Sequence, residues 1–514
     1  MLLALAWLPW PTRATAAQTD APALFARHCA GCHGRNRLGG MGPALLPGSL
    51  HRLPRNQAAE VIARGRPSTQ MPAFGEKLSP AQIKALATYI YTPPDQEPVW
   101  DERKIRASRI LYPAWRTARP DDPPVYDADP LNLFLVVESG DHHVTVLDGD
   151  RMEPITRFPS RRALHGGPKY SSSGRYVYFA SRDGWIGKYD MYRLQMLAEV
   201  RAGINTRNVA VSADDRYLMV GNYLPQNLVI LDAHDLSLIK IIEVKDDFGR
   251  RSRVSAVYTV PPRQSFVAAL KDLKEVWEIS YADAPEPVYN GLMHDYRMTE
   301  GLAETGPFPV RRIRLDDYLD DFFFDPSYEH LIGAARGGHK GQVINLLVGR
   351  KIADIDLPGM PHLGSGITWK WRDTRVLATP NLREGVVSII DMKNWKTIKR
   401  IETGGPGFFM RSHENSPYAW VDVFAGPRRD QVHVIDKQTL EIVRSLRPVP
   451  GKTSGHVEFT RDGSKVLLSI WDMDGAVIVY DARTLKELKR LPMRKPVGKY
   501  NVYNKINRSE GTSH

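Results

Sequence analysis

Cysteine is the scarcest residue of this 514-residue chain, and its two copies, Cys29 and Cys32, lie in one heptad, HCAGCHG. A structural zinc site needs four ligands, and the absence of a second thiol pair argues against one. A CxxC redox site usually ends a strand of a βαβ unit, whereas the residues around this pair are typical of helices. The pair followed by His33 is the attachment signature of a c-type haem, in which two thioethers hold the porphyrin and the histidine binds the iron.

Long apolar runs and blocks of like charge are also missing. Beyond the first ten residues, no run approaches the roughly 18 apolar residues that suggest a membrane span. The formal net charge is +12, yet there is no block of five or more like charges and no nucleic-acid-binding motif. We therefore predict neither a membrane span nor a nucleic-acid partner. The positive charge either attracts an acidic partner or an anionic ligand, or makes a generally basic surface.

The N-terminal residues have the composition of a targeting segment. MLLALAWLPW is apolar, and TRATAA contains the A-x-A pattern Ala14-Thr15-Ala16 of a cleavage site. The usual basic residues at the start are missing, which leaves the true start site open. We expect residues 1–17 to be a signal peptide. Because haem c is attached outside the bacterial cytoplasm, we expect the mature protein in the periplasm.

A methionine in a Pro- and Gly-flanked loop is the candidate for the second iron ligand. Met71 lies in RGRPSTQMPAFGEKLSPAQIKALATYIY, 38 residues after His33 and before a helix expected from about Ser79 to Tyr91. A Met ligand keeps haem iron in an electron-transfer state and raises its potential. Methionine is also a common core filler, so the interpretation depends on the surrounding sequence.

That surrounding sequence resembles a known domain. The segments APALFARHCAGCHG, GGMGPAL and MPAFGEKLSPAQIKALATYI resemble a class I cytochrome c over residues 20–95. We predict an α-helical cytochrome c domain over residues 18–95 with one covalent haem c. Its attachment residues are Cys29 and Cys32, and its iron ligands are His33 and Met71.

Residues 96–130 are rich in Pro and Asp and are predicted to be a linker, after which short strands recur with turn residues between them. Six of these strands end at Asp148, Asp190, Asp232, Asp391, Asp436 and Asp481, with spacings of 42, 42, 45 and 45 residues inside the two groups of three. EVWEISYAD and GQVINLLVGRKIADI fill the gap between the groups. Eight repeats of this length predict an all-β eight-bladed propeller over residues 131–514.

A propeller is a scaffold, and its function depends on groups in its loops. Four histidines lie in loops before a strand: His165, His362, His413 and His456. Such histidines are candidate ligands or bases, because imidazole titrates near neutrality and binds iron. Histidines within strands or turns, such as His330, are interpreted as structural.

The domain order and three local motifs resemble the cytochrome cd1 family over essentially the whole chain. The motifs are HGGPKYSSSGRYVYFASRDGWIGKYD, GMPHLGSG and PVGKYNVYNK. The resemblance implies that His165 is the proximal iron ligand of haem d1 and that His362 is one distal histidine. The nitrite reductases of this family have a second distal histidine, and Asp320 aligns with it here. An aspartate would repel nitrite, whose reduction requires groups that stabilise an anion and supply protons.

The resemblance therefore favours the branch of the family that makes haem d1, oxidising a propionate of dihydro-haem d1 to an acrylate. His165 would bind the substrate iron, His362 would act as general base or second ligand, and His456 would position the reacting side chain. Electrons would pass to haem c and then to a periplasmic acceptor. The tetrapyrrole carboxylates require cations, and the candidates, each of which could instead be a solvated surface residue, are Arg162, Lys169, Arg182 and Arg207.

Three other functions stay open at this point. They are a nitrite reductase with an altered distal pocket, a haem d1 carrier without chemistry, and a module that docks other proteins. The redox haem argues against a docking module, and a carrier would need neither Met71 nor an electron acceptor. Nitrite reductase or other haem d1 biosynthesis proteins are possible partners. Haem d1 could be a permanent cofactor or a transient substrate.

Overall fold

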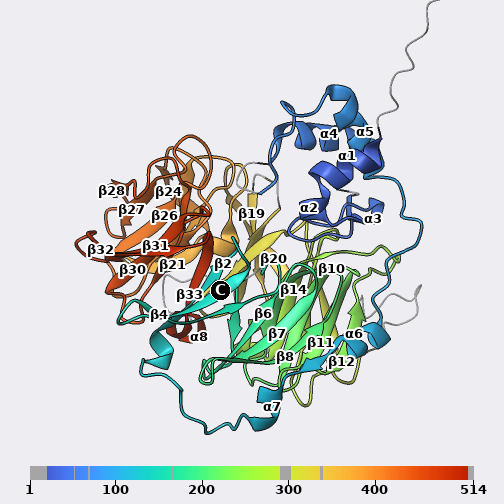
Figure 1. The fold of residues 1–514 in the computed structure, drawn as a ribbon, viewed down its shortest axis with the longest axis horizontal. Coiled ribbons are helices and arrows are strands. Elements are labelled where there is room, and N and C mark those ends of the chain that lie inside the picture. Colours follow the sequence, from blue (N-terminus) through green and yellow to red (C-terminus); the bar gives the residue numbers. More distant parts are fainter. Residues whose placement is uncertain are drawn as a thin grey trace, which may run out of the picture.

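A computed structural model describes the chain with gaps, over residues 20–50, 52–66, 70–164, 167–289, 303–335, 338 and 340–507. The predicted signal peptide, residues 1–17, and the predicted iron ligand His165 lie outside the described residues. A small α-helical part lies against a large ring of β-sheets, with α2 and α3 facing the sheets and α4 and α5 turned away (Figure 1). The predicted fold class, a cytochrome c domain followed by an eight-bladed propeller, is confirmed.

The helical part is built around one apolar core, and its helices begin where capping residues stand. Asp20 caps α1 and Ser79 forms a capping box with Gln82 at the start of α5, which satisfies backbone N–H groups that lack partners within a helix. Phe25 is fully buried in this core. The helices are α1 (Ala21–His28), α2 (Ala30–His33), α3 (Pro47–Leu50), α4 (Arg55–Arg64) and α5 (Pro80–Tyr89).

Eight antiparallel sheets form the blades in the described part of the chain. We number the blades along the chain. Blade 1 has β33 (Pro496–Asn501), β2 (Leu133–Glu138), β3 (His143–Asp148) and β4 (Glu153–Pro159); blade 2 has β5 (Lys169–Tyr170), β6 (Tyr176–Ala180), β7 (Trp185–Asp190) and β8 (Gln195–Arg201); blade 3 has β9 (Asn205–Val211), β10 (Tyr217–Leu224), β11 (Asn227–Asp232) and β12 (Leu238–Glu243); blade 4 has β13 (Val254–Val260), β14 (Ser265–Leu270), β15 (Glu275–Ser280) and β16 (Val310–Arg314).

The second half of the ring has the same design. Blade 5 has β17 (Asp321–Phe324), β18 (His330–Ala334), β19 (Lys340–Asn345) and β20 (Arg350–Asp356); blade 6 has β21 (Ile367–Trp371), β22 (Thr374–Pro380), β23 (Val386–Asp391) and β24 (Lys396–Glu402); blade 7 has β25 (Met410–Arg411), β26 (Tyr418–Asp422), β27 (Val432–Asp436) and β28 (Ile442–Leu446); blade 8 has β29 (Ser454–Phe459), β30 (Lys465–Ile470), β31 (Gly475–Asp481) and β32 (Glu487–Met493). Short 3-10 turns η1 (Pro130–Asn132), η2 (Pro261–Arg263) and η3 (Leu363–Ser365) precede β2, β14 and β21, and α8 (Val502–Asn507) follows β33.

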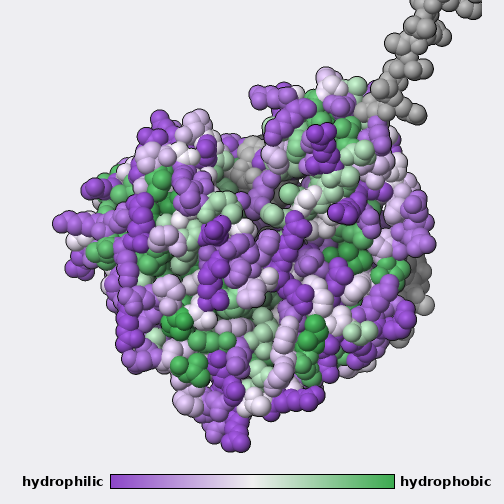
Figure 2. Space-filling model, viewed as in Figure 1, coloured by the Kyte–Doolittle hydropathy of each residue, from purple (hydrophilic) through white to green (hydrophobic). Residues whose placement is uncertain are grey.

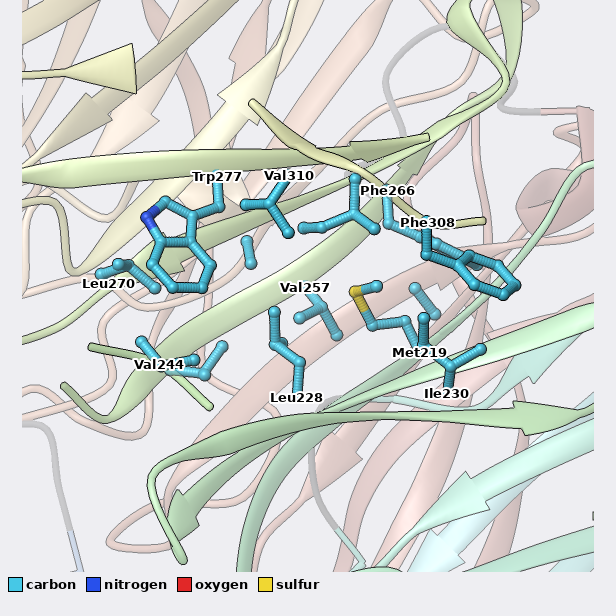
Figure 3. Close-up of a cluster of buried hydrophobic side chains, with 14 of the residues drawn as sticks. Met219, Leu228, Ile230, Val244, Val257, Phe266, Leu270, Trp277, Phe308 and Val310 are labelled. Carbon is cyan, nitrogen blue, oxygen red and sulfur yellow. The ribbon is translucent and has the colours of Figure 1, made fainter. Parts of the chain in front are cut away.

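The core lies between neighbouring blades. Met219, Leu228 and Ile230 of blade 3 pack against Phe266 and Trp277 of blade 4, and all five are buried (Figure 3). Because neighbouring blades cover an inner strand on both faces, the fully buried β2 and β14 are apolar on both, apart from Glu138 and Ser265. The face of the molecule seen in Figure 2 is mostly hydrophilic, with hydrophobic residues in separate patches.

The repeated aspartates terminate the third strand of their blades and shape the turn that follows. Asp148 accepts hydrogen bonds from the backbone N–H groups of Asp150 and Arg151, and Asp436 does the same for Gln438 and Thr439. The residue four positions after each repeated aspartate has a positive φ, between 54° and 60°: Met152, Leu194, Leu236, Trp395, Leu440 and Leu485. The side-chain hydrogen bonds stabilise a turn that L-residues otherwise rarely adopt.

Two strand pairings join segments that are distant in the sequence, and the first of them closes the ring of blades. The strand β33 near the C-terminus pairs antiparallel with β2, which joins the last described residues to the first blade. Residues 96–130, which the sequence predicts to be a linker, contain α6 (Glu102–Ser108), the short strand β1 (Ile110–Leu111) and α7 (Pro113–Thr117), and β1 pairs with the outer strand of blade 2. Within the described ranges, no helix is long and apolar enough to cross a membrane.

An ion-pair network joins the helical domain to the propeller. The guanidinium of Arg52 lies 3.2 and 3.3 Å from the two carboxylate oxygens of Asp320 and stacks on the ring of Tyr318 with its Cζ 4.1 Å from the ring centroid. Arg52 also donates a hydrogen bond to the backbone carbonyl of Lys271. The ammonium of Lys271 is 2.6 Å from the Asp320 carboxylate, which is only 3% exposed.

We predict that Arg52→Ala lowers the free energy of unfolding by about 1–3 kcal/mol, because a buried carboxylate loses one of its two cations. The control is Arg64→Ala, which removes an exposed pair with Glu60 and should change the free energy by less than about 0.5 kcal/mol. Denaturant titration measures both. Equal losses in the two variants would contradict the structural role of Arg52.

Candidate functional site

The two cysteines lie at the junction of α1 and α2, where a tight turn brings them together. Cys29 closes α1, and its carbonyl accepts hydrogen bonds from the N–H groups of Cys32 and His33 at 3.1 and 2.9 Å. Neither thiol forms a disulfide. Burial, followed by the charge of Cys32, raises the pKa of Cys29 to about 11. Both thiols are therefore available in one turn, as two thioether bonds to a porphyrin require.

The ring of His33 is oriented for an iron on its other side. Its Nδ1 donates a hydrogen bond to the Pro43 carbonyl at 2.8 Å, which leaves Nε2 with a free lone pair. A Cβ on Gly42 would lie 2.6 Å from the ring, so only glycine fits there. Burial lowers the pKa of His33, so that the ring is neutral. A backbone-oriented neutral imidazole is the usual form of a metal-binding histidine, and these residues fit a c-type haem.

Met71 borders the same apolar core as Cys29, and both side chains are partly buried there. The Met71 carbonyl accepts a hydrogen bond from the N–H of Arg66 at 3.1 Å. A Cβ on Gly65 would lie 2.6 Å from this carbonyl. The loop before α5 is thus tied to the end of α4, which keeps the thioether beside the core that carries the CxxCH turn.

Arg162 lies at the domain interface rather than beside the other predicted cations. Its Nη2 donates a 2.6 Å hydrogen bond to the carbonyl of Gly31, one of the two residues between the cysteines. Nearby, Gly39 approaches Asn205 so closely that a Cβ would lie 2.7 Å from the amide. Arg162 precedes His165 by three residues, so the loop of the predicted proximal ligand contacts the predicted haem c turn. The two segments that carry the predicted redox sites are therefore in contact.

Arg182 and Arg207, two of the predicted carboxylate-binding cations, lie in one cationic cluster around Tyr223. The Arg182 guanidinium lies 5.6 Å from the centre of the ring, and Arg207 donates to the Ser255 carbonyl at 2.7 Å. Two further members that no sequence pattern indicated, Arg253 and Lys271, lie 5.8 and 6.0 Å from the same ring. Burial raises the pKa of the Tyr223 phenol, but the four cations outweigh burial and lower it to about 7. The cluster is suited to anionic groups.

Tyr258 links this cluster to the predicted base. Its ring lies 5.1 Å from the ammonium of Lys169 and packs edge-on against Phe322 at 5.0 Å. Burial and the Asp321 carboxylate raise the pKa of Tyr258, whereas Arg207 lowers it. Lys169, Arg207 and Asp321 therefore act on one buried phenol, although they come from blades 2, 3 and 5.

His362 has the geometry of a general base. Its Nδ1 donates to the Phe408 carbonyl at 2.7 Å, and its ring packs on that of Phe408 at 4.3 Å. The proton is thereby held at Nδ1, and Nε2 carries the lone pair. Nε2 lies 3.7 Å from a carboxylate oxygen of Asp321. A proton taken up at Nε2 would be stabilised by this carboxylate.

Asp320, which the sequence analysis placed in a distal pocket, has a different neighbourhood. Its carboxylate is held by Arg52 and Lys271 at the domain interface, and the aspartate beside His362 is Asp321. Consecutive residues at the start of β17 point to opposite sides, so that one aspartate anchors the cytochrome domain and the next faces the histidine. The expected repulsion of nitrite by Asp320 is weakened, because two cations neutralise that carboxylate.

His456, the second predicted catalytic residue, is buried and has a positive φ of 54°. Its ring lies between Phe409, at 4.7 Å, and Tyr500, at 5.0 Å. Burial lowers the pKa of His456 well below its usual value, and Lys499 and other nearby cations lower it further. Burial raises the pKa of Tyr500 to about 12. At neutral pH the pair is therefore uncharged and suited to hydrogen bonding.

Comparisons with known proteins agree with this architecture. A family model described as Cytochrome D1 heme domain matches residues 128–298 and 298–505, and one described as Cytochrome C oxidase, cbb3-type, subunit III matches residues 16–90. A dihydro-heme d1 dehydrogenase of Pseudomonas aeruginosa is 58% identical over 502 residues, which cover 98% of this chain and 97% of the relative.

Two further matches show how far the similarity to known proteins extends. A nitrite reductase of Stutzerimonas stutzeri is 26% identical, with 94% of this chain and 92% of that protein covered. The solved structure of dihydro-heme d1 dehydrogenase NirN in complex with DHE superposes with a TM-score of 0.77 at 57% identity and covers 95% of this chain and 99% of that chain. From these matches and its cytochrome c domain, the protein belongs to the cytochrome cd1-type family whose propeller is the Cytochrome D1 heme domain.

Proposed function

We propose that the protein is an oxidoreductase that converts dihydro-haem d1 to haem d1 in haem d1 biosynthesis. The observation that carries the proposal is the 58% identity, along nearly the whole of both chains, to a dihydro-heme d1 dehydrogenase. The site supports it, because Nε2 of His362 faces the Asp321 carboxylate, four cations surround the Tyr223 phenol, and a c-type haem turn adjoins the propeller. The substrate is a tetrapyrrole with several carboxylates, which the cations suit.

The chemistry removes hydrogen from a saturated side chain. One C–H bond breaks on each of two adjacent propionate carbons and a C=C bond forms, so that two protons and two electrons leave the substrate. His362 takes up one of the two protons at Nε2, where Asp321 stabilises the resulting imidazolium, and the other proton leaves to solvent. His456, with Tyr500, positions the side chain through neutral hydrogen bonds, and His165 binds the substrate iron.

The remaining residues hold the substrate and the electron acceptor. Arg182, Arg207 and Lys169 bind the substrate carboxylates. Arg162 acts at the contact with the CxxCH turn, and through that contact rather than through a carboxylate it links the two halves of the site. Haem c, when bound to Cys29 and Cys32, supplies one-electron redox chemistry. His33 of the CxxCH turn and Met71 of the loop before α5 would bind its iron.

The c-type haem indicates the compartment in which the protein works. We propose a periplasmic protein whose residues 1–17 are a signal peptide, with domains over residues 18–95 and 131–514 joined by residues 96–130. Its electrons pass to a periplasmic acceptor, and its product is used by nitrite reductase or handed to other haem d1 proteins. A nitrite reductase is the second candidate, favoured by the 26% identity to one, but Asp320 is bound by two cations and is no substitute for a distal histidine.

The first prediction for the proposed function concerns Met71 as a ligand of haem c. The protein should carry one covalent haem c, and Met71→Ala should keep it while losing the weak near-infrared sulfur–iron band and moving to a lower reduction potential. Absorption spectroscopy and a redox titration measure this. The Cys29→Ser/Cys32→Ser variant is the control and should lose the covalent haem. An unchanged spectrum in Met71→Ala would indicate a different ligand.

A further prediction concerns His165, the proposed ligand of the substrate iron. His165→Ala should weaken the binding of dihydro-haem d1, because the substrate iron loses its protein ligand, while the haem c spectrum stays unchanged. A spectral titration of the purified protein with dihydro-haem d1 measures the dissociation constant. Binding and substrate absorption equal to those of the wild type would exclude His165 as the ligand.

The reaction itself is tested without oxygen, with dihydro-haem d1 and an electron acceptor. The product should lose two mass units and show the haem d1 spectrum, and His362→Ala should slow conversion by about 10²-fold or more, the loss expected for a general base. His330→Gln is the control, since His330 pairs with Asp325 within blade 5, and its rate should stay near the wild-type rate. Nitric oxide formation from nitrite without conversion of the precursor would identify a nitrite reductase instead, and binding without either reaction a carrier.

A further inference from the structure

One buried carboxylate connects the two candidate catalytic histidines. Asp422 ends β26 of blade 7 and is fully buried. Its Oδ1 accepts hydrogen bonds from the backbone N–H groups of Phe408 and Phe409 at 2.7 and 3.0 Å. Its Oδ2 accepts one from the backbone N–H of His456 at 3.2 Å. The carboxylate therefore joins the loop before β25 to the first strand of blade 8.

Each of these hydrogen bonds holds a backbone segment that contains or contacts one of the two histidines. The Phe408 carbonyl is the acceptor for Nδ1 of His362, so the position of Phe408 sets the orientation of that ring. The Phe409 ring packs against the His456 ring, and the backbone of His456 is held directly. His362, His456 and their partners come from three blades, and the Asp422 side chain is the group that contacts the segments of both.

We propose that Asp422 is a positioning residue for the dehydrogenation, because its carboxylate keeps His362 and His456 in one fixed arrangement. This inference rests on the proposed function. Asp422 does not contact the substrate itself. It acts through the backbone of Phe408, Phe409 and His456, and a displacement of about 1 Å in such groups costs up to 10²-fold in rate.

Other blades show that an amide can occupy the equivalent place without loss of the fold. Asn222 of blade 3 donates from its side chain to the Ala202 carbonyl at 3.0 Å, and Asn381 after β22 accepts from the N–H of Met360 at 3.3 Å. Both side chains tie the loop before their blade to the second strand. At position 422, by contrast, all three neighbours are N–H donors. An asparagine could accept from Phe408 and Phe409, but its NH₂ would then face the N–H of His456.

The test is Asp422→Asn in the full-length protein loaded with haem c. We expect kcat for dihydro-haem d1 to fall about tenfold or more, with the dissociation constant for the substrate, from spectral titration, within about threefold of wild type. Hydrogen exchange should be faster at the backbone amides that lose an acceptor, above all that of His456. Asp430→Asn is the matched control: Asp430 is also buried in blade 7 and accepts from the N–H of Gly451, and this variant should keep its kcat within about twofold.

A double mutant separates positioning from general damage. Asp422→Asn/His456→Ala should be no slower than His456→Ala beyond about twofold, because the asparagine still accepts from Phe408 and Phe409 and the loss that it causes arises at His456. A multiplied loss in the double mutant, or a wild-type kcat in Asp422→Asn, would overturn the inference. If Asp422→Asn does not fold, Gly455→Ala replaces it, since its Cβ would lie 2.9 Å from Oδ2 of Asp422 and would displace the carboxylate without removing it.

Failure of the proposed function is recognised separately. If the wild-type protein binds dihydro-haem d1 but does not oxidise it, the proposed reaction is wrong, while the exchange experiment still reports on Asp422. Unchanged exchange of the His456 amide in Asp422→Asn would then be evidence against the positioning role. Faster exchange there, together with an altered spectrum of the bound tetrapyrrole, would support it.

Discussion

The antiparallel pairing of β33 with β2 is the interaction on which the rest of the structure depends. A single blade cannot bury both of its faces, so the eight sheets are stable only as a closed ring, and this pairing closes it. The same strand supplies part of the site. Lys499 donates from its ammonium to Ser469 at 2.9 Å and to the carbonyl of His456, and Tyr500 packs on the His456 ring. The strand that closes the ring therefore also positions His456.

Two buried carboxylates, Asp320 and Asp422, are accommodated in the described part of the chain by defined partners. Burying an ion without compensation costs several kcal/mol, and the interior meets this requirement in two ways. Asp320 is paired with two cations at the domain interface, and Asp422 is held by three backbone N–H groups. In the cationic cluster around Tyr223, Arg253 pairs with Asp272 and Lys271 pairs with Asp320. The positive charge of this cluster suits a substrate that brings its own carboxylates.

The domain contact explains how two redox sites come to adjoin. Arg162, in the loop before blade 2, contacts Gly31 within the CxxCH turn, and Arg52 contacts Asp320 across 268 residues of sequence. The first contact brings the turn near the loop of His165, and the second prevents the helical domain from moving away.

The sequence by itself determined the haem c turn, the helical and propeller domains and the turn at the end of each third strand. These features depend on local spacing: CxxCH within one turn, capping residues at α1 and α5, and aspartates that recur every 42 to 45 residues. Local patterns also indicated His362 and His456, which lie in glycine-containing segments before or at the start of a strand.

Only the tertiary structure decided which groups surround those histidines. Asp320 and Asp321 are neighbours in the sequence, yet one holds Arg52 and the other faces His362, because successive residues of an extended chain point to opposite sides. Arg162, which was predicted to bind a carboxylate, contacts the other domain in the structure. Arg253, Lys271 and Asp422 carry no local signal. Their partners come from other blades or distant loops, and only the closing of the ring brings them into contact.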